Sequence, residues 1–148
     1  MDRFLIKRLP NAADLPLPQY MTESAAGMDL YAAIDEPVKM EPMGRVVVPC
    51  GFQMALPHGY EAQIRPRSGL ARQHGVTMLN APGTIDADYR GEVGVLLINL
   101  GDAPYTINRG DRIAQMIVAK AIQVAFEEAD ELPDSARGAG GFGSTGKS

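Results

Sequence analysis

The sequence is poor in the residues on which sulfur and imidazole chemistry depends, with one cysteine, Cys50, and two histidines, His58 and His74, among 148 residues. A lone cysteine excludes an intrachain disulfide, and we expect Cys50 to fill a small apolar space in or beside the core. The three side chains are too few to assemble a zinc site of the usual three or four nitrogen and sulfur ligands. Neither histidine lies in a recognisable nucleophile context, so a Ser-His-Asp triad is not favoured either.

Long hydrophobic runs and an excess of positive charge are also absent. No apolar stretch approaches the ~20 residues that a membrane-spanning helix needs, and residues 1–8 are too charged for a signal peptide. We therefore expect a cytoplasmic protein without a membrane partner. The formal net charge of −4 argues against binding to a nucleic-acid polymer.

Short runs rich in β-branched residues occupy much of the chain. The 16 glycines and 11 prolines are distributed between these runs and do not cluster as a linker. Each run has the length of a strand, and several are bounded by Pro or Gly, so the pattern predicts an all-β sandwich or barrel. One stretch, residues 68–75, predicts a short helix that begins at an N-cap, Ser68, and closes at Gly75. The predicted strands are residues 45–48, 52–56, 61–65, 76–79, 93–100 and 113–118.

The last part of the chain, from about residue 133, shifts to Gly, Ser, Ala and Thr. We expect one globular domain over residues 1–132 and a flexible tail over residues 133–148. Residues 141–148 spell the Walker A pattern G-x-x-x-x-G-K-S, but a P-loop needs a buried strand before it and a helix after it. Since no helix follows Ser148 here, we expect no P-loop NTPase, although glycine-rich backbone can wrap phosphate oxygens in other arrangements.

Arginine outnumbers lysine, and several arginines lie in glycine-containing segments. The planar guanidinium suits phosphate, although any one of them alone would be an ordinary surface residue. In residues 66–71, Arg67 is a charge-assisted donor, Ser68 carries a hydroxyl and Gly69 leaves the backbone accessible, a combination that can bind an anion. Taken alone, the segment would be interpreted as a plain capped helix, and an anion site is favoured only if other segments agree. The arginines in question are Arg67, Arg90, Arg109, Arg112 and Arg137.

Five segments, in order along the chain, resemble the motifs of the trimeric dUTPase family. The third is specific, whereas the first and fourth alone are weak. The segments are 26–30 (Ala-Gly-Met-Asp-Leu), 66–71 (Pro-Arg-Ser-Gly-Leu-Ala), 83–92 (Gly-Thr-Ile-Asp-Ala-Asp-Tyr-Arg-Gly-Glu), 109–115 (Arg-Gly-Asp-Arg-Ile-Ala-Gln) and 137–146 (Arg-Gly-Ala-Gly-Gly-Phe-Gly-Ser-Thr-Gly). The resemblance implies a distorted jelly-roll subunit with one short helix, a flexible C-terminal arm and a homotrimer with sites between subunits.

The activity that the resemblance implies is hydrolysis of dUTP to dUMP and pyrophosphate, which would keep uracil out of DNA and supply dUMP for thymidylate synthesis. Water would attack the α-phosphorus in line with the leaving pyrophosphate, assisted by Mg²⁺ bound mainly through the substrate triphosphate and without a direct protein ligand. Asp29 is the one residue expected near that metal, either ordering a metal-bound water or simply holding a neighbouring arginine. The resemblance does not choose between these two roles.

Residues 76–79, a turn at 80–83 and a return through 93–100 predict a hairpin around the third segment. Asp86 and Asp88 are two residues apart, so on an extended chain they would share a face. By resemblance Asp86 is the general base, because a carboxylate is ionised at neutral pH and can take a proton from water. Tyr89 would pack against the deoxyribose and leave no room for a 2′-hydroxyl.

The remaining site residues also follow from the resemblance. Uracil would be read by the Asn80 amide and by backbone groups of Thr84, Ile85 and Gly94. Phosphates would be held by Arg67, Ser68 and Gly69, with Gln115 near the phosphates and the attacking water. In the tail, Phe142 would stack on uracil while Arg137 and residues Gly143, Ser144 and Thr145 close over the outer phosphates. Asp111 and Arg112 would belong to a structural ion-pair network at an interface.

Two alternatives remain open at this level. A dCTP deaminase would share the fold and the serine-arginine phosphate segment, but it would need a different hairpin from the one at residues 83–91. A non-catalytic trimer that binds a partner would be indistinguishable by sequence if it retained the site.

Overall fold

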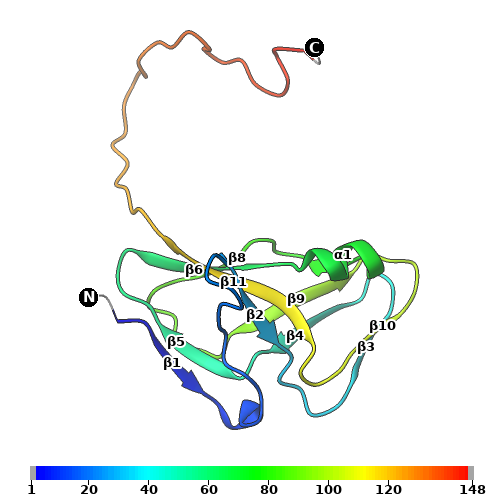
Figure 1. Cartoon of the computed structure of the whole chain (residues 1–148). Coiled ribbons are helices and arrows are strands. Elements are labelled where there is room, and N and C mark those ends of the chain that lie inside the picture. The colour runs from blue at the N-terminus through cyan, green and yellow to red at the C-terminus, as the bar shows by residue number, and fades with distance from the viewer. Residues whose placement is uncertain (1–2, 147–148) are drawn as a thin grey trace.

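The computed structural model describes residues 3–146, and its body consists of short strands with one α-helix (Figure 1). All strand pairs in it are antiparallel. In chain order the elements are β1 (Leu5–Arg8), the 3-10 helix η1 (Pro10–Ala12), β2 (Met28–Tyr31), β3 (Val38–Met40), β4 (Arg45–Pro49), β5 (Phe52–Ala55), β6 (Tyr60–Arg65), α1 (Ser68–His74), β7 (Val76–Met78), β8 (Gly83–Ile85), β9 (Gly94–Asn99), β10 (Tyr105–Ile107) and β11 (Arg112–Lys120).

The sheets join strands that are far apart in sequence, as in a jelly roll. A four-stranded sheet has the order β2-β11-β6-β8 and a three-stranded sheet has the order β4-β9-β7, with β1-β5 and β10-β3 as separate pairs. The predicted all-β fold with one short helix is therefore confirmed. Each of the six predicted strands is present, with its ends shifted by at most two residues.

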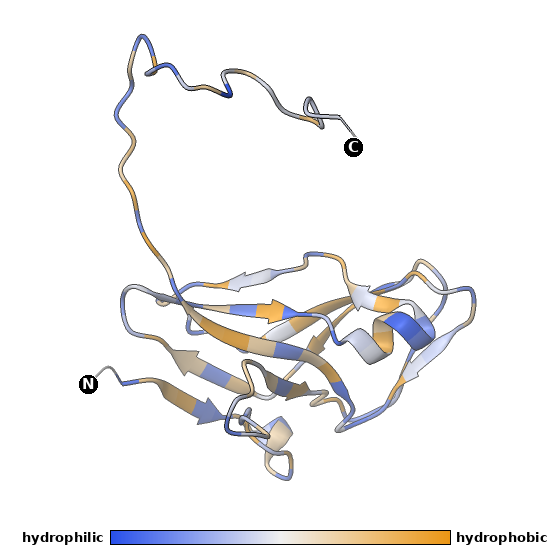
Figure 2. Cartoon of the chain, turned by 45° about the horizontal axis from the view of Figure 1, so that its top comes forward, coloured by the Kyte–Doolittle hydropathy of each residue, from blue (hydrophilic) through white to orange (hydrophobic). Residues whose placement is uncertain are grey.

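The core lies between the sheets and is filled by alternate residues of the strands. In β6 and β9 buried and more exposed positions alternate over much of their length, as expected for strands with one face on a core. The largest side chains with almost no exposed surface include Phe52, Leu30 and Leu97. Figure 2 shows the hydrophobic positions distributed along these strands. Cys50 is buried among them as expected, and burial together with the charge of Glu92 raises the pKa of its thiol to about 12.

The helix starts differently from the prediction. Its N-cap is Arg67, in an extended conformation, so Ser68 is already the first helical residue and no side chain caps the helix by a hydrogen bond. The predicted C-terminal end is correct: Gly75 has φ +68°, and its N–H donates to the carbonyl of Ala71 at 3.0 Å. A Cβ at Gly75 would lie 2.5 Å from the backbone nitrogen of Gly101, so glycine is required there.

The predicted hairpin is only partly correct. β7 pairs with β9 as expected, but the connection between them crosses to the other sheet, where β8 pairs with β6. After β8 the chain turns at once, since the N–H of Tyr89 donates to the carbonyl of Asp86 at 3.1 Å. Asp86 and Asp88 therefore lie in a turn and not on one face of a strand.

Beyond β11 the chain leaves the body, and residues 121–146 contain no helix or strand (Figure 1). We call residues 121–146 the arm. Apolar side chains along it are almost fully exposed, among them Phe126 and Phe142. The last two residues of the Walker-like match, Lys147 and Ser148, lie outside the described residues. Within residues 3–146 no helix is long and apolar enough to cross a membrane.

Candidate active site

The turn after β8 forms one wall of a small cavity of about 190 Å³, which we call the hairpin cavity. Five residues that the sequence predicted for substrate binding line it together, although they come from β8, the turn and the start of β9. They are Thr84, Ile85, Asp86, Tyr89 and Gly94, joined by Glu92 and Val93. Because β8 is an edge strand of its sheet, it has one side without a neighbouring strand.

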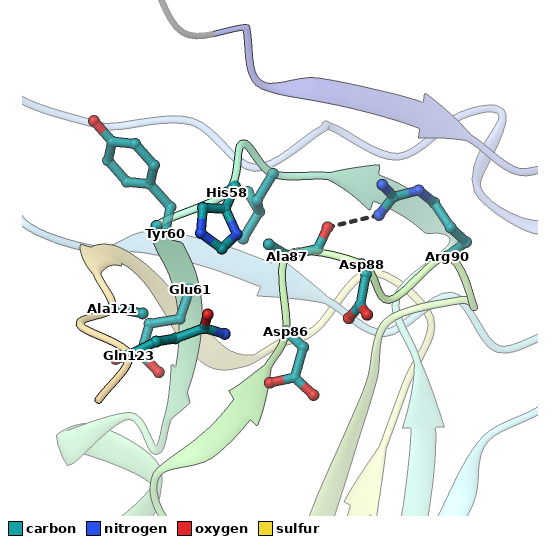
Figure 3. Close-up of a pocket in the computed structure, with 11 residues that line it drawn as sticks. His58, Tyr60, Glu61, Asp86, Ala87, Asp88, Arg90, Ala121 and Gln123 are labelled. Atoms are coloured by element: carbon teal, nitrogen blue, oxygen red, sulfur yellow. Dashed lines mark hydrogen bonds between the residues drawn. The ribbon is translucent and has the colours of Figure 1, made fainter. Parts of the chain in front are cut away.

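Asp86 lies where the hairpin cavity meets a larger cavity of about 520 Å³. Asp88 lines only the larger one, together with residues such as Glu61 and Gln123. Figure 3 shows the two carboxylates pointing away from Arg90, whose guanidinium donates to the carbonyls of Ala87 at 2.7 Å and Tyr89 at 2.9 Å. Within residues 3–146 the exposed Asp86 carboxylate has no hydrogen bond or ion pair, so its oxygens are available to a water molecule.

The side chain of Tyr89 folds back over the backbone that follows it in the chain. Its hydroxyl donates to the carbonyl of Glu92 at 2.9 Å. The ring crosses Gly91 so closely that a Cβ there would lie 2.3 Å from the tyrosine hydroxyl oxygen. The carboxylate of Glu92 in turn accepts hydrogen bonds from Asn11 Nδ2 at 2.8 Å and from the N–H of Gly51 at 2.9 Å. Nothing in the sequence indicated these roles for Glu92 and Asn11.

A second cluster gathers charged residues at the β2, β11 and β6 end of the four-stranded sheet. Asp29 lies opposite Gln115 in the pairing of β2 with β11, and Gln115 also lies opposite Arg65 at the end of β6. Asp29 Oδ1 is 3.3 Å from Arg67 Nε, and Asp29 Oδ2 is 3.4 Å from Arg112 Nη1. Of the two roles left open for Asp29, the structure shows the pairing with arginine. We call Asp29, Arg67, Arg112 and Gln115 the arginine cluster.

Backbone contacts complete this cluster. Arg67 Nη1 donates to the carbonyl of Arg112 at 3.1 Å, and Gln115 Nε2 donates to the carbonyl of Pro66 at 3.0 Å. A Cβ at Gly27 would lie 2.7 Å from Gln115 Oε1, so a side chain at this position would displace the Gln115 amide. Ser68 and Gly69 are exposed at the start of α1, and a Cβ at Gly69 would meet nothing within 4 Å. The backbone there is open to a ligand.

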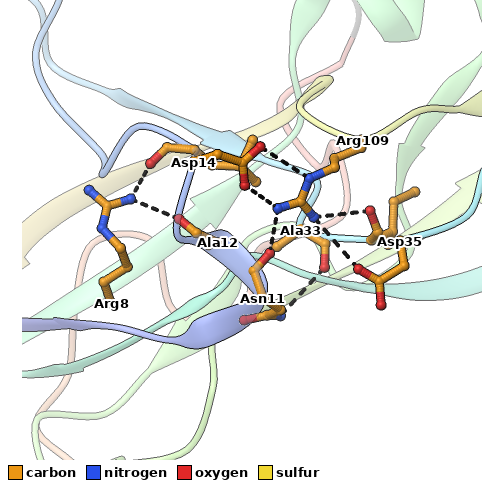
Figure 4. Close-up of polar contacts among 9 residues, drawn as sticks. Arg8, Asn11, Ala12, Asp14, Ala33, Asp35 and Arg109 are labelled. Carbon is orange, nitrogen blue, oxygen red and sulfur yellow. Dashed lines mark hydrogen bonds and ion pairs between the residues drawn. The ribbon is translucent and has the colours of Figure 1, made fainter.

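Arg109 and Asp111 make structural contacts within the chain. Arg109 Nη2 is 2.5 Å from Asp14 Oδ1 and 2.7 Å from the carbonyl of Asn11 (Figure 4). The hydrogen bond from Arg109 lowers the pKa of Asp14. Asp111 accepts the N–H of Asn108 at 2.7 Å and closes a turn, so it is not paired with Arg112 in the described part of the chain. Arg109 therefore fastens the N-terminal segment to the body.

The remaining predicted residues are not brought to either site in this chain. Asn80 is exposed beside Gly83 and does not line the hairpin cavity. Phe142 is exposed in the arm, while Arg137 Nε donates within the arm to the carbonyl of Gly140 at 2.6 Å. Gly143, Ser144 and Thr145 lie in the same stretch, where the Ser144 N–H donates to Gly141. No residue of the arginine cluster lines the hairpin cavity.

Comparisons with known proteins agree with this arrangement of fold and residues. The family model described as dUTPase matches residues 13–146. The deoxyuridine 5'-triphosphate nucleotidohydrolase of Beijerinckia indica subsp. indica is 58% identical over 146 residues, which cover 97% of this chain and 91% of that protein. The chain therefore belongs to the dUTPase family and is a nucleotide hydrolase.

Solved structures show the same jelly-roll fold. The Staphylococcus bacteriophage 80alpha dUTPase with dUPNHPP matches with a TM-score of 0.87 and 25% identity, over 98% of this chain and 99% of that one. A point mutant of the dUTPase from phage phi11 of S. aureus matches with a TM-score of 0.78 and 21% identity, over 89% of this chain and 99% of that one. That second structure is described as showing the coordination of a structural Mg(II) ion.

Proposed function

We propose that this chain hydrolyses dUTP to dUMP and pyrophosphate. The observation that carries the proposal is the hairpin cavity, in which the edge strand β8, a free Asp86 carboxylate and the fixed ring of Tyr89 lie together. The family membership and the likeness to a deoxyuridine 5'-triphosphate nucleotidohydrolase support the choice of substrate.

The nucleoside half of dUTP is assigned to the hairpin cavity. Backbone groups of Thr84 and Ile85 would bind the uracil edge, since an edge strand offers alternating donors and acceptors, and the backbone of Gly94 at the start of β9 would contribute to it. The Asn80 amide would complete this edge after a small movement toward the cavity. The ring of Tyr89 would lie against the deoxyribose, and the space it fills would exclude a 2′-hydroxyl.

The phosphates are assigned to the arginine cluster and the start of α1. Arg67, the Ser68 hydroxyl, the Gly69 backbone and Gln115 offer donors to phosphate oxygens, and Asp29 keeps Arg67 in place. No residue of the arginine cluster lines the hairpin cavity of the same chain, which supports a complete site formed by two copies. We infer a homotrimer, as the resemblance implies, with the cavity of one subunit facing the arginine cluster of its neighbour.

In the reaction, Asp86 would accept a proton from a water held at its carboxylate. The oxygen of that water forms a bond to the α-phosphorus while the bond from that phosphorus to the bridging oxygen breaks, and pyrophosphate departs with the electron pair. Arg67 and the other donors of the phosphate site would stabilise the charge that develops on the phosphate oxygens.

Mg²⁺ fits this arrangement if it is bound mainly through the triphosphate of the substrate. Within residues 3–146 no group of three or more His, Cys, Asp and Glu side chains is placed to hold a metal. Asp29, the carboxylate beside the phosphate site, is paired with two guanidinium groups and would contact the ion only through water. When bound, the ion would offset the negative charge of the phosphates.

The arm is assigned the role of a lid. We propose a globular domain over residues 1–132 and a flexible arm segment over residues 133–148 that closes over a site between neighbouring subunits. Phe142 would stack on uracil, while Arg137, Gly143, Ser144 and Thr145 would contact the outer phosphates and exclude bulk water. The cellular role would be the removal of dUTP and the supply of dUMP for thymidylate synthesis in the cytoplasm.

A panel of nucleoside triphosphates tests the proposal, with released pyrophosphate and ammonia measured in parallel. We expect pyrophosphate from dUTP and far less from UTP, dTTP or dCTP. Ammonia from dCTP would identify a deaminase. No release from any of them would favour the non-catalytic partner-binding protein.

A further inference from the structure

The carbonyl that receives the Tyr89 hydroxyl is anchored from both sides. On one side, the Val93 N–H donates to the carbonyl of Phe52 at 2.9 Å and the Val93 carbonyl accepts the N–H of Cys50 at 2.9 Å. On the other side, the Glu92 carboxylate accepts the Gly51 N–H at 2.9 Å and Asn11 Nδ2 at 2.8 Å. The backbone just below Tyr89 is thus tied to two distant segments of the chain.

Gly51 and Asn11 are themselves rigidly placed. A Cβ at Gly51 would lie 2.1 Å from Ala12 Cβ, and the Gly51 carbonyl accepts the N–H of Leu9 at 2.8 Å. Asn11 lies in η1, and its carbonyl accepts a hydrogen bond from Arg109 (Figure 4). The two donors to Glu92 therefore come from a packed part of the body and not from a loose loop.

Tyr89, in contrast, has little else to hold it. It is 45% exposed, and its ring passes over Gly91, which has no side chain. The hydroxyl contact with the Glu92 carbonyl is the one side-chain hydrogen bond of Tyr89 within residues 3–146. The position of that carbonyl consequently decides how far the ring reaches toward the hairpin cavity.

We propose that Glu92, held by Asn11, is a positioning residue that sets the Tyr89 ring and thereby the discrimination between deoxyribose and ribose. This inference rests on the proposed function, because it takes Tyr89 as the wall against the sugar. Glu92 touches no reacting atom in it. Its carboxylate acts through the backbone carbonyl and the tyrosine hydroxyl.

The test compares kcat/KM for dUTP and UTP in full-length variants. Glu92→Ala removes both carboxylate contacts but leaves the Val93 anchors, so the protein should fold. We expect the dUTP-to-UTP ratio to fall by roughly tenfold, the order of effect expected when partly buried hydrogen bonds that hold a side chain are lost. KM for dUTP should rise while kcat at saturation changes little, since the reacting groups are untouched.

Three further variants separate positioning from general stability. Glu92→Gln retains an acceptor oxygen and should restore the wild-type ratio. Asn11→Ala removes one donor without altering Glu92 and should lower the ratio by a smaller factor. Asn99→Ala is the control for general stability, because the buried Asn99 Nδ2 donates to the carbonyls of Met40 and Ala103 and contacts neither Glu92 nor Asn11. It should lower the melting temperature but leave the ratio unchanged.

The outcomes are distinct from failure of the proposed function. A wild-type protein that does not prefer dUTP to UTP would overturn the proposed function itself. A wild-type preference that persists unchanged in Glu92→Ala and Asn11→Ala would overturn this inference alone. So would an equal loss of preference in Asn99→Ala, because a general loss of stability would then be sufficient.

Discussion

Asp29 Oδ1 lies 3.3 Å from Arg67 Nε, and this contact joins two of the five segments, β2 and the N-cap of α1. The Asp29 side chain is only 18% exposed, so the pair is better shielded than an ordinary surface ion pair. It gives Arg67 a fixed direction before any phosphate binds.

Replacing Asp29 by asparagine tests this pairing. Arg67 and Arg112 would lose their anionic partner, and kcat/KM for dUTP should fall by roughly ten- to a hundredfold because charged hydrogen bonds are lost. The Mg²⁺ concentration that gives half-maximal activity decides the mode of action. A positioning role leaves it unchanged, whereas a large increase would show that Asp29 acts on the metal-bound water.

Asp86→Asn should abolish most of the turnover. The amide keeps the shape of the side chain but cannot accept the proton, so kcat should fall by about 10²- to 10⁴-fold. Calorimetry with a non-hydrolysable dUTP analogue should show nearly unchanged affinity. Asp88→Asn is the matched control, since Asp88 lies in the same turn but outside the hairpin cavity, and it should keep most of its activity. Near-normal turnover in Asp86→Asn would remove Asp86 from this role.

If the proposed sites are shared between subunits, two inactive variants should complement each other. Asp86→Asn disables the hairpin cavity and Arg67→Ala disables the arginine cluster, so each variant alone should be almost inactive. After the two are unfolded and refolded together in equal amounts, about a quarter of the sites should combine two intact halves by random assortment. Light scattering should show trimers. A fully active monomer, or a mixture with no regained activity, would contradict the shared site.

Removal of residues 138–148 tests the arm. Phe142 is fully exposed and makes no contact with the body, so the melting temperature and the oligomeric state should be nearly unchanged. If the arm orders over the triphosphate, kcat should fall by about a hundredfold, because loss of closure admits water and misplaces the phosphates. Phe142→Ala should be milder in the same direction. Equal turnover by the shortened and complete chains would make this segment a simple tail.

The strands that the sequence predicted lie in runs of four or more residues rich in β-branched and other apolar side chains, as in β9 and β11. Among the strands it missed, β3 and β10 have only three residues each. Their pairing is decided by packing and leaves almost no periodic pattern in the chain. The sequence also placed β8 in a hairpin. Whether β8 pairs with β6 or with β7 depends on the packing of the two sheets, which the local sequence does not show.

The candidate site divides in the same way. Arg67, Asp86 and Tyr89 were found because they lie in short continuous segments with recognisable composition. The contact between Glu92 and Asn11 joins residues that are 81 positions apart, and no local sequence pattern indicates it. The sequence predicted Ser68 as the N-cap in place of Arg67, because serine is one of the residues usually preferred at that position.

The buried state of Cys50 has a practical consequence. Thiol reagents attack the thiolate, and a thiol enclosed in the core with a pKa of about 12 offers almost none at neutral pH. A cysteine introduced at the exposed Ser135 would then be the sole reactive thiol of the chain. Spin labels or fluorophores attached there would report on the arm alone, with the native protein as an unlabelled background.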